Sequence, residues 1–179
     1  MSTLRRIWVL NKDRFPIESI HTIVFDFDGV FTDNYVYVNS QGDETVRCSR
    51  ADSYGVNLLT KAIKNEHQKI SCFVLSTETD PVVSARCRKM GIDCYSGFSN
   101  KWEFLGNWLD QNRPGIIHPE KGLVFFGNDL NDLEAMSHSG FSISPSDAHP
   151  AVKQISSFVL DSSGGQGFVR EGIEFILNL

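Results

Sequence analysis

Two aspartates one residue apart, Asp26 and Asp28, stand directly after a short apolar run and directly before Gly29. Alternate residues of a strand share a face, so two acids at this spacing would point the same way and repel each other. A cation between them would relieve that repulsion. Since the run Ile23–Phe25 should bury their backbone, we interpret the pair as a metal site rather than as two solvated turn acids.

Two more polar clusters follow later apolar runs in the same way. Ser76 and Thr77 follow residues 70–75, and the cluster Asn128, Asp129 and Asp132 follows residues 123–126. The carboxyl ends of parallel strands open on one edge of a sheet, so these side chains can converge there. Lys101, at the start of an intervening helix, would bring a positive charge to the same edge.

This set of residues is typical of phosphoryl transfer. Oxygen atoms of Asp26, Asp28 and the third loop would hold Mg²⁺. One carboxylate would attack phosphorus and form an aspartyl-phosphate, and the other would serve as general acid and then as base for water. Ser76 and nearby backbone N–H groups would bind phosphate oxygens, while Lys101 would balance the negative charge in the transition state.

The elements that must position these residues alternate along the chain. Strands are predicted at 23–25, 70–75, 92–95, 123–126, 141–143 and 158–160, with helices at 53–64, 81–90, 100–113, from 133, 148–155 and 168–179. This order predicts an α/β fold, a Rossmann-like three-layer parallel sheet covered on both faces. Residues 35–38 and 45–48 predict a β-hairpin that should lean on the main sheet or on another subunit.

We predict one domain at 20–179, with no cap domain, preceded by an N-terminal extension at 1–19. The net charge of −5 argues against a nucleic-acid binder, which would carry a basic patch. No apolar run approaches the ~20 residues of a membrane span. The four cysteines show no CxxC spacing and no secretory leader is evident, so we expect a reduced, cytoplasmic protein.

At this level of detail the sequence resembles a known family. Residues 26–32 (DFDGVFT) are similar to motif I of the haloacid dehalogenase superfamily of phosphatases, and Ser76, Lys101 and 127–132 stand as motifs II, III and IV. The hairpin after motif I, residues 50–55 (RADSYG) and residues 164–171 (GGQGFVRE) resemble the capless 3-deoxy-D-manno-octulosonate 8-phosphate phosphatase branch. The nearest likeness is to the phosphatase-like domain of bacterial acylneuraminate cytidylyltransferases.

The resemblance implies an enzyme, a Mg²⁺-dependent phosphomonoester hydrolase of sugar-acid phosphates. It implies Asp26 as nucleophile and Asp28 as acid and base. It further implies a homotetramer built on the hairpins, in which a neighbour's C-terminal glycine-rich segment closes the site.

Two departures from the family pattern bear on substrate and metal. Glu78 stands where many relatives have arginine, and a relative acting on nine-carbon ketodeoxy acids has glutamate there and a lysine matching Lys89. We therefore expect a nine-carbon, sialic-acid-like 9-phosphate as substrate, with octulosonate 8-phosphate next. Asn128 replaces a metal-binding aspartate, which should weaken Mg²⁺ binding unless Asp129 compensates, directly or through water.

Several of these residues have a plain structural alternative. Asp132 is either a helix-start acid or the partner that orients Lys101, and both can hold. Asp52 either lines the pocket, which we favour, or caps the helix that follows the hairpin. Arg170 either makes a weak helix-start ion pair or reaches a substrate carboxylate or phosphate across a subunit boundary. The alternative function is a catalytically weak or inactive module that oligomerises or regulates a cytidylyltransferase.

Overall fold

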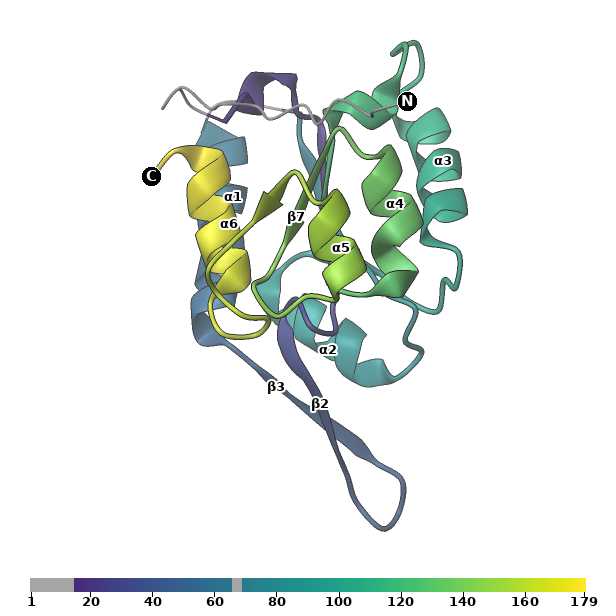
Figure 1. Ribbon diagram of the computed structural model, residues 1–179, viewed down its shortest axis with the longest axis vertical. Coiled ribbons are helices and arrows are strands. Elements are labelled where there is room, and N and C mark those ends of the chain that lie inside the picture. Colours follow the sequence, from purple (N-terminus) through teal and green to yellow (C-terminus); the bar gives the residue numbers. More distant parts are fainter. Residues whose placement is uncertain (1–14, 66–68) are drawn as a thin grey trace.

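The computed structural model describes residues 15–65 and 69–179, and its centre is a six-stranded parallel sheet (Figure 1). The strand order is β5-β4-β1-β6-β7-β8. The strands are β1 (Thr22–Phe25), β4 (Ser71–Leu75), β5 (Asp93–Tyr95), β6 (Leu123–Phe126), β7 (Phe141–Ser144) and β8 (Phe158–Val159). The predicted α/β class is confirmed.

Helices cover both faces of the sheet. They are α1 (Arg50–Asn65), α2 (Pro81–Met90), α3 (Lys101–Asn112), α4 (Leu133–His138), α5 (Pro150–Ile155) and α6 (Phe168–Leu177). In β1, Ile23 and Phe25 enter the core under α1, α2 and α6, whereas Val24 enters the core under α3, α4 and α5. A strand buried on both sides by this alternation is apolar throughout, which is why residues 22–25 form the middle of the sheet.

The helix boundaries follow local chemistry. The Asp80 carboxylate accepts the backbone N–H of Val82, Pro81 occupies the first turn, and Gly91 closes α2 in the left-handed conformation. Asn100 caps α3 by accepting the N–H of Glu103. This cap fixes where α3 begins and so places Lys101 in its first turn.

The N-terminal boundary lies earlier than residue 20 in the structure. Phe15 is buried against Phe141, Phe158 and Phe175, and its backbone N–H donates to Asn178 Oδ1 at 2.8 Å. Residues from 15 onward therefore pack on the domain, and residues 1–14 of the predicted extension lie outside the described residues. In the described ranges, no helix is long and apolar enough to cross a membrane.

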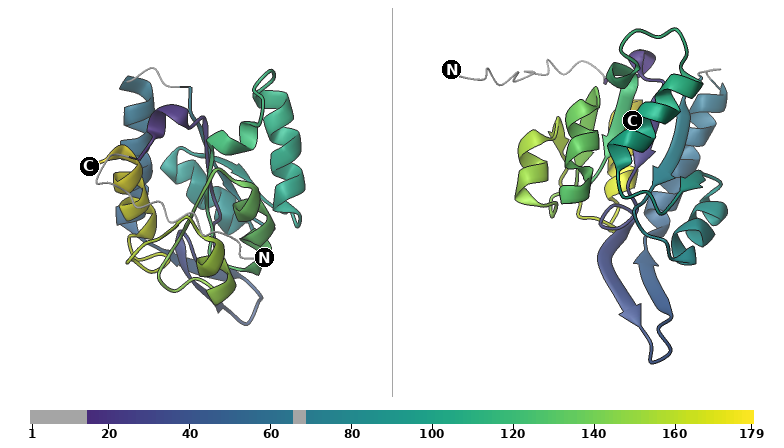
Figure 2. Two further views of the ribbon diagram at one scale, coloured as in Figure 1. Left: turned by 45° about the horizontal axis from the view of Figure 1, so that its top comes forward. Right: turned by 90° about the vertical axis from the view of Figure 1, so that its right-hand side faces the viewer.

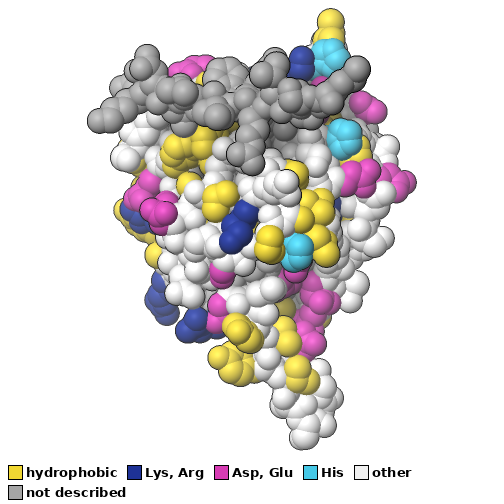
Figure 3. Space-filling model, viewed as in Figure 1, with side chains coloured by type: hydrophobic (Ala, Val, Ile, Leu, Met, Phe, Trp, Pro, Cys, Tyr) yellow, Lys and Arg dark blue, Asp and Glu magenta, His cyan; other side chains and the backbone are white. Residues whose placement is uncertain are grey.

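The predicted hairpin is present but does not join the main sheet. Strands β2 (Thr32–Val38) and β3 (Glu44–Cys48) form a separate two-stranded sheet that projects from the body (Figure 2). Apolar side chains stand along this projection (Figure 3). Tyr35 is 72% exposed and Tyr37 62%, and the intervening Val36 and Val38 are exposed as well. Both faces of the ribbon are thus apolar and uncovered.

Candidate active site

The site is built where β1 and its neighbour β6 end side by side. Asp26 continues the pairing of the two strands, since its backbone N–H donates to the Phe126 carbonyl at 2.8 Å. This bond fixes the backbone from which the Asp26 carboxylate projects. The residue is only 4% exposed. A carboxylate held in this way loses its water and needs a partner within the protein.

The partner is Lys101, at the start of α3. Its Nζ lies 2.6 Å from Asp26 Oδ1 and 2.6 Å from Asp132 Oδ1. Lys101 is 2% exposed and Asp132 is 0% exposed. The three side chains therefore form a buried chain of charges, two negative and one positive, that joins the ends of β1 and β6 to α3.

Asp132 also organises the loop after β6. Its Oδ2 accepts the backbone N–H groups of Asn128 at 2.9 Å and Asp129 at 3.2 Å. The geometry thus combines both alternatives left open by the sequence, because the same carboxylate stabilises a helix start and contacts the lysine. Gly127 makes this possible, since a Cβ there would meet the Asp132 carboxyl carbon at 2.8 Å.

Burial and charge shift the ionisation of this cluster. Burial and the Asp132 carboxylate raise the pKa of Asp26, Lys101 acts against both, and the result is a pKa of about 7. Burial lowers the pKa of Lys101, but Asp26 and Asp132 together bring it above its ordinary value. Lys101 is therefore a fixed cation, while Asp26 has one positive neighbour and is short of positive charge.

A cation would supply that charge, and the oxygen atoms around Asp26 fit one. The Asn128 side chain can turn either end of its amide to its neighbours. With its NH₂ group toward them, it donates to Asp26 Oδ2 at 3.3 Å and to the Asp28 backbone carbonyl at 2.7 Å. With its oxygen toward them, three oxygens from three residues face one another, which is favourable only around a hard cation such as Mg²⁺.

This donor set differs from a cluster of acids. Across residues 15–65 and 69–179, no group of three or more His, Cys, Asp and Glu side chains could hold a metal. A cation here would be held instead by one carboxylate, one carbonyl and one amide. Asp28 enters through its backbone because β1 ends at Phe25 and the chain turns at Gly29, with φ of 74°. Its carboxylate is therefore not placed by strand alternation, as the sequence had suggested.

The Asp28 carboxylate is held by the loop that follows it. Thr32 Oγ1 donates to Asp28 Oδ1 at 3.3 Å and accepts the backbone N–H of Gly29 at 3.1 Å. Burial raises the pKa of Asp28, the Thr32 hydroxyl lowers it, and the charge of Glu78 raises it. Asp28 is thus a half-buried acid beside the cluster of Asp26, with a pKa above its ordinary value.

The end of β4 forms the next part of the edge. Ser76 is buried, and its hydroxyl accepts the backbone N–H of Glu78 at 3.0 Å. Thr77 lies half-buried across from the loop after β6, with its hydroxyl 3.5 Å from Asn131 Nδ2. Glu78 folds back on its own loop and accepts the N–H groups of Thr79 and Asp80 at 2.6 and 3.0 Å.

Two predicted residues are not brought to Asp26. Asp129 accepts the N–H of Leu130 at 2.7 Å, as the cap of a short 3-10 helix. Among the described residues, its carboxylate makes no hydrogen bond with Asp26, Asp28 or Asn128. Lys89 is exposed in the last turn of α2, roughly 12 Å along the axis from the helix start.

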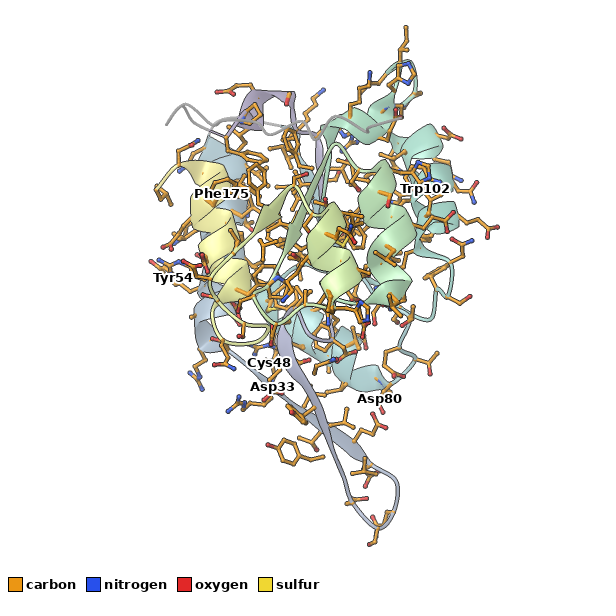
Figure 4. The ribbon with its side chains drawn as sticks, in the orientation of Figure 1. Asp33, Cys48, Tyr54, Asp80, Trp102 and Phe175 are labelled. Carbon is orange, nitrogen blue, oxygen red and sulfur yellow. The ribbon has the colours of Figure 1, made fainter. Side chains whose placement is uncertain are left out.

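Asp52 and Arg170 belong to a different contact. Asp52 is completely buried and accepts the N–H groups of Gly167 at 3.3 Å and Arg170 at 3.0 Å, so it caps α6 and not α1, the helix that follows the hairpin. The Arg170 guanidinium pairs with Glu174 at 2.5 Å and lies over the Tyr54 ring, on the outer side of α1 (Figure 4). Within its own chain, Arg170 therefore forms the weak ion pair at a helix start, with Glu174.

Sequence reasoning missed two features of the site. Thr32, which contacts Asp28, is part of the quoted motif, and a threonine four residues after an acid at a turn was the available signal. The glycine-rich segment 164–167 was expected to serve a neighbouring subunit. Within its own chain it packs against the loop after β1, where the Gly165 N–H donates to the Val30 carbonyl at 3.0 Å, and its role toward a neighbour stays a prediction. Nothing in the sequence spacing indicated that contact.

The chain is similar to known proteins over most of its length. The model of a family described as haloacid dehalogenase-like hydrolase matches residues 9–171. The 3-deoxy-D-manno-octulosonate 8-phosphate phosphatase KdsC of Escherichia coli (strain K12) is 30% identical over 161 residues, which are 89% of this chain and 80% of that protein.

Two solved structures are similar over most of their length. One is a HAD family hydrolase from Streptomyces avermitilis, at 33% identity and a TM-score of 0.81, covering 90% of this chain and 87% of that one. The other is the octulosonate 8-phosphate phosphatase of Moraxella catarrhalis, solved with a magnesium ion, a phosphate ion and KDO. It is 26% identical, has a TM-score of 0.79, and covers 90% of this chain and 88% of that one.

Proposed function

This chain belongs to the haloacid dehalogenase-like hydrolase family, and we propose that it is a Mg²⁺-dependent phosphatase of a 2-keto-3-deoxy sugar-acid phosphate. The observation that carries the proposal is the buried Asp26–Lys101–Asp132 chain beside Asp28. A nucleophile, an acid and a fixed cation meet there at one sheet edge. Such a cluster is costly to bury without a function that uses its charges.

In the proposed reaction the Asp26 carboxylate attacks phosphorus. The P–O bond to the sugar breaks, the bond to Asp26 Oδ forms, and the leaving alkoxide takes a proton from Asp28. Asp28, now ionised, accepts a proton from water as that water attacks the aspartyl-phosphate. The second step releases inorganic phosphate and restores both carboxyl groups.

Lys101 neutralises charge in both steps. Its ammonium is held by Asp26 and Asp132 at 2.6 Å each, so it needs no rearrangement to meet the developing charge. The Ser76 hydroxyl and the backbone N–H groups after β4 would bind the phosphate oxygens. When bound by Asp26, the Asp28 carbonyl and Asn128, Mg²⁺ supplies the positive charge that the protein lacks for a phosphate dianion.

The choice between sugar acids rests on Glu78, at the edge of the site. Glu78, near enough to Asp28 to raise its pKa, places a negative charge where the resemblance to the family implies arginine. That charge disfavours a substrate carboxylate at this position and accepts hydrogen bonds from hydroxyl groups. We therefore keep a nine-carbon, sialic-acid-like 9-phosphate as the first candidate and octulosonate 8-phosphate as the second.

The hairpin supports a homotetramer as the working form. A two-stranded ribbon with apolar side chains on both faces is unstable in water unless something covers it. A covering subunit would bury Tyr35 and Tyr37 on one face and Val36 and Val38 on the other. The same subunit could bring residues to the open side of the site, including an exposed Lys89 or Arg170.

A second function is favoured by one observation, the amide at position 128. If Asn128 keeps its NH₂ group toward Asp26 and Asp28, the site is satisfied by hydrogen bonds and binds no cation. The chain would then be an inactive module that oligomerises or regulates a partner such as an acylneuraminate cytidylyltransferase.

A phosphate-release assay separates the two functions. The purified chain is incubated with 9-phosphorylated nine-carbon ketodeoxy acids, octulosonate 8-phosphate and simple hexose phosphates, with Mg²⁺ or with EDTA. The proposal predicts Mg²⁺-dependent release that is fastest with a nine-carbon acid. Release from none of them would overturn it in favour of the inactive module, and faster release from octulosonate 8-phosphate would reverse only the substrate order.

A further inference from the structure

The glycine-rich turn 164–167 lies in backbone-to-backbone contact with the loop after β1. Besides the bond from Gly165 to Val30, a Cβ on Gly164 would meet the Gly29 carbonyl oxygen at 2.1 Å. A Cβ on Gly165 would meet the Thr32 carbonyl carbon at 2.4 Å. No side chain fits between the two segments, so a displacement of the turn is passed directly to the loop.

That loop sets the position of the Asp28 carboxylate. The Thr32 hydroxyl accepts the N–H groups of Gly29 and Asn34 at 3.1 and 3.2 Å and points its own hydrogen toward Asp28 Oδ1. Because both N–H groups fix the position of the hydroxyl oxygen, the direction of its O–H bond depends on the Thr32 backbone. Gly165 touches the Thr32 backbone directly, in addition to its bond to Val30.

Two carboxylates from distant elements hold the ends of the turn. Asp147 Oδ1 accepts the Gly164 N–H at 3.0 Å. Asp52, buried at the start of α1, accepts the Gly167 N–H at 3.3 Å and also caps α6. Hydrogen bonds to charged acceptors are roughly twice as strong as neutral ones, so the turn is fixed at both ends.

We propose that the Gly164–Gly167 turn is a positioning element for Asp28, acting through Thr32, and that Asp52 and Asp147 are the positioning residues that clamp it. The proposal rests on the proposed function, in which Asp28 gives its proton to the leaving alcohol. It assigns the two clamping acids no contact with substrate.

The proposal predicts a dependence on the leaving group. An alkoxide from a sugar needs the proton of Asp28, whereas p-nitrophenolate leaves without one. A displaced Asp28 should therefore lower kcat/KM, which reports the first chemical step, for an alkyl phosphate much more than for p-nitrophenyl phosphate. General loss of folded protein would lower both equally.

Gly165→Ala and Asp147→Asn test this, the second being the milder change. The control is Gly115→Ala, which has a similarly left-handed φ of 84° but open space around its Cβ. The alkyl substrate is whichever of octulosonate 8-phosphate and the nine-carbon 9-phosphate the unmodified protein hydrolyses faster. Melting temperatures identify variants that remain folded.

We expect kcat/KM for the alkyl phosphate to fall about tenfold or more relative to that for p-nitrophenyl phosphate in Gly165→Ala, and by a smaller factor in Asp147→Asn. Gly115→Ala should leave the ratio unchanged. An unchanged ratio in both folded turn variants would overturn the positioning role. If the unmodified protein hydrolyses neither substrate, the proposed function fails instead, and this inference with it.

Discussion

The buried centre of the site and its open rim are built in opposite ways. At the centre, Asp26, Lys101 and Asp132 are almost fully buried and each charge contacts another at 2.6 Å. At the rim, the Glu78 carboxylate accepts N–H groups of its own loop, from Thr79 and Asp80, and Lys89 is exposed. One chain therefore fixes the groups that we propose to act on phosphate, whereas the residues that we propose to select the sugar are held only by their own loop or are exposed.

Removing the proposed nucleophile should give the largest loss of activity, because no other group of the buried centre can replace it. The same variant tests whether the centre carries the chemistry. Asp26→Asn keeps the shape but cannot attack phosphorus, so we expect kcat to fall about 10³-fold or more with every phosphate ester. The assay is phosphate release at saturating substrate and Mg²⁺. An Asp26→Asn protein with more than a tenth of the original kcat would show that the buried centre has been misread.

Lys101→Met should damage both activity and stability, because it leaves two acids buried without a cation. Breaking a buried ion pair in this way costs about 3–5 kcal/mol, which corresponds to a fall in Tm of roughly 10 °C for a domain of this size. Thermal unfolding without Mg²⁺ measures it. The matched variant Lys101→Met/Asp132→Asn should recover part of the Tm and none of the activity.

If the single and double variants have the same Tm, the 2.6 Å contacts do not couple these side chains. The centre would then be no more tightly organised than the rim, and the contrast between the two regions would not hold.

Asn128→Asp should raise the affinity of the proposed cation site for Mg²⁺. A second carboxylate among the ligands would lower the Mg²⁺ concentration for half-maximal activity about tenfold, while lowering Tm in EDTA through repulsion from Asp26. Thermal shift against Mg²⁺ concentration reads the affinity independently of turnover. An unchanged Mg²⁺ midpoint would mean that residue 128 does not face the cation.

The hairpin tests whether the rim is completed by another subunit. Tyr35→Glu/Tyr37→Glu places charges on one exposed face of the hairpin. We therefore expect the tetramer to dissociate into monomers, measured by analytical ultracentrifugation, and we expect these monomers to remain folded, measured by thermal unfolding. KM should rise while p-nitrophenyl phosphate is still hydrolysed. A monomeric unmodified protein would contradict the tetramer.

The smallest effects should come from the rim itself. Lys89→Ala should change kcat/KM by less than about threefold in a dissociated monomer, since its charge is exposed and screened. Glu78→Gln should change substrate preference more than rate. Steady-state kinetics on the eight- and nine-carbon acids measure both. A hundredfold loss of kcat in either variant would place that residue in the chemical centre.

The sequence predicted most of the fold because its signals are local. Asp80, Pro81 and Gly91 bound one helix and Asn100 begins another, and the buried strands are apolar runs. The parallel strand ends then bring Asp26, Ser76 and Asn128 to one edge.

The rest could not be predicted because it depends on contacts between residues far apart in the chain. The cap that Asp52 forms on α6 spans more than a hundred residues, as does the packing of Gly165 on Val30. At Asp28 the backbone carbonyl, and not the carboxylate, faces Asn128. This depends on where β1 ends, a boundary that the pairing of the strands sets. Phe15 likewise joins the core through Phe175, near the other end of the chain.

The most direct test of the account is to trap phosphate on Asp26. The protein is mixed with a nine-carbon 9-phosphate and Mg²⁺, quenched in acid within milliseconds, digested and analysed by mass spectrometry. We predict one phosphoryl group on the peptide that contains Asp26, absent in Asp26→Asn and in EDTA. Phosphate release at full rate with no phosphorylated peptide at any quench time would contradict the account.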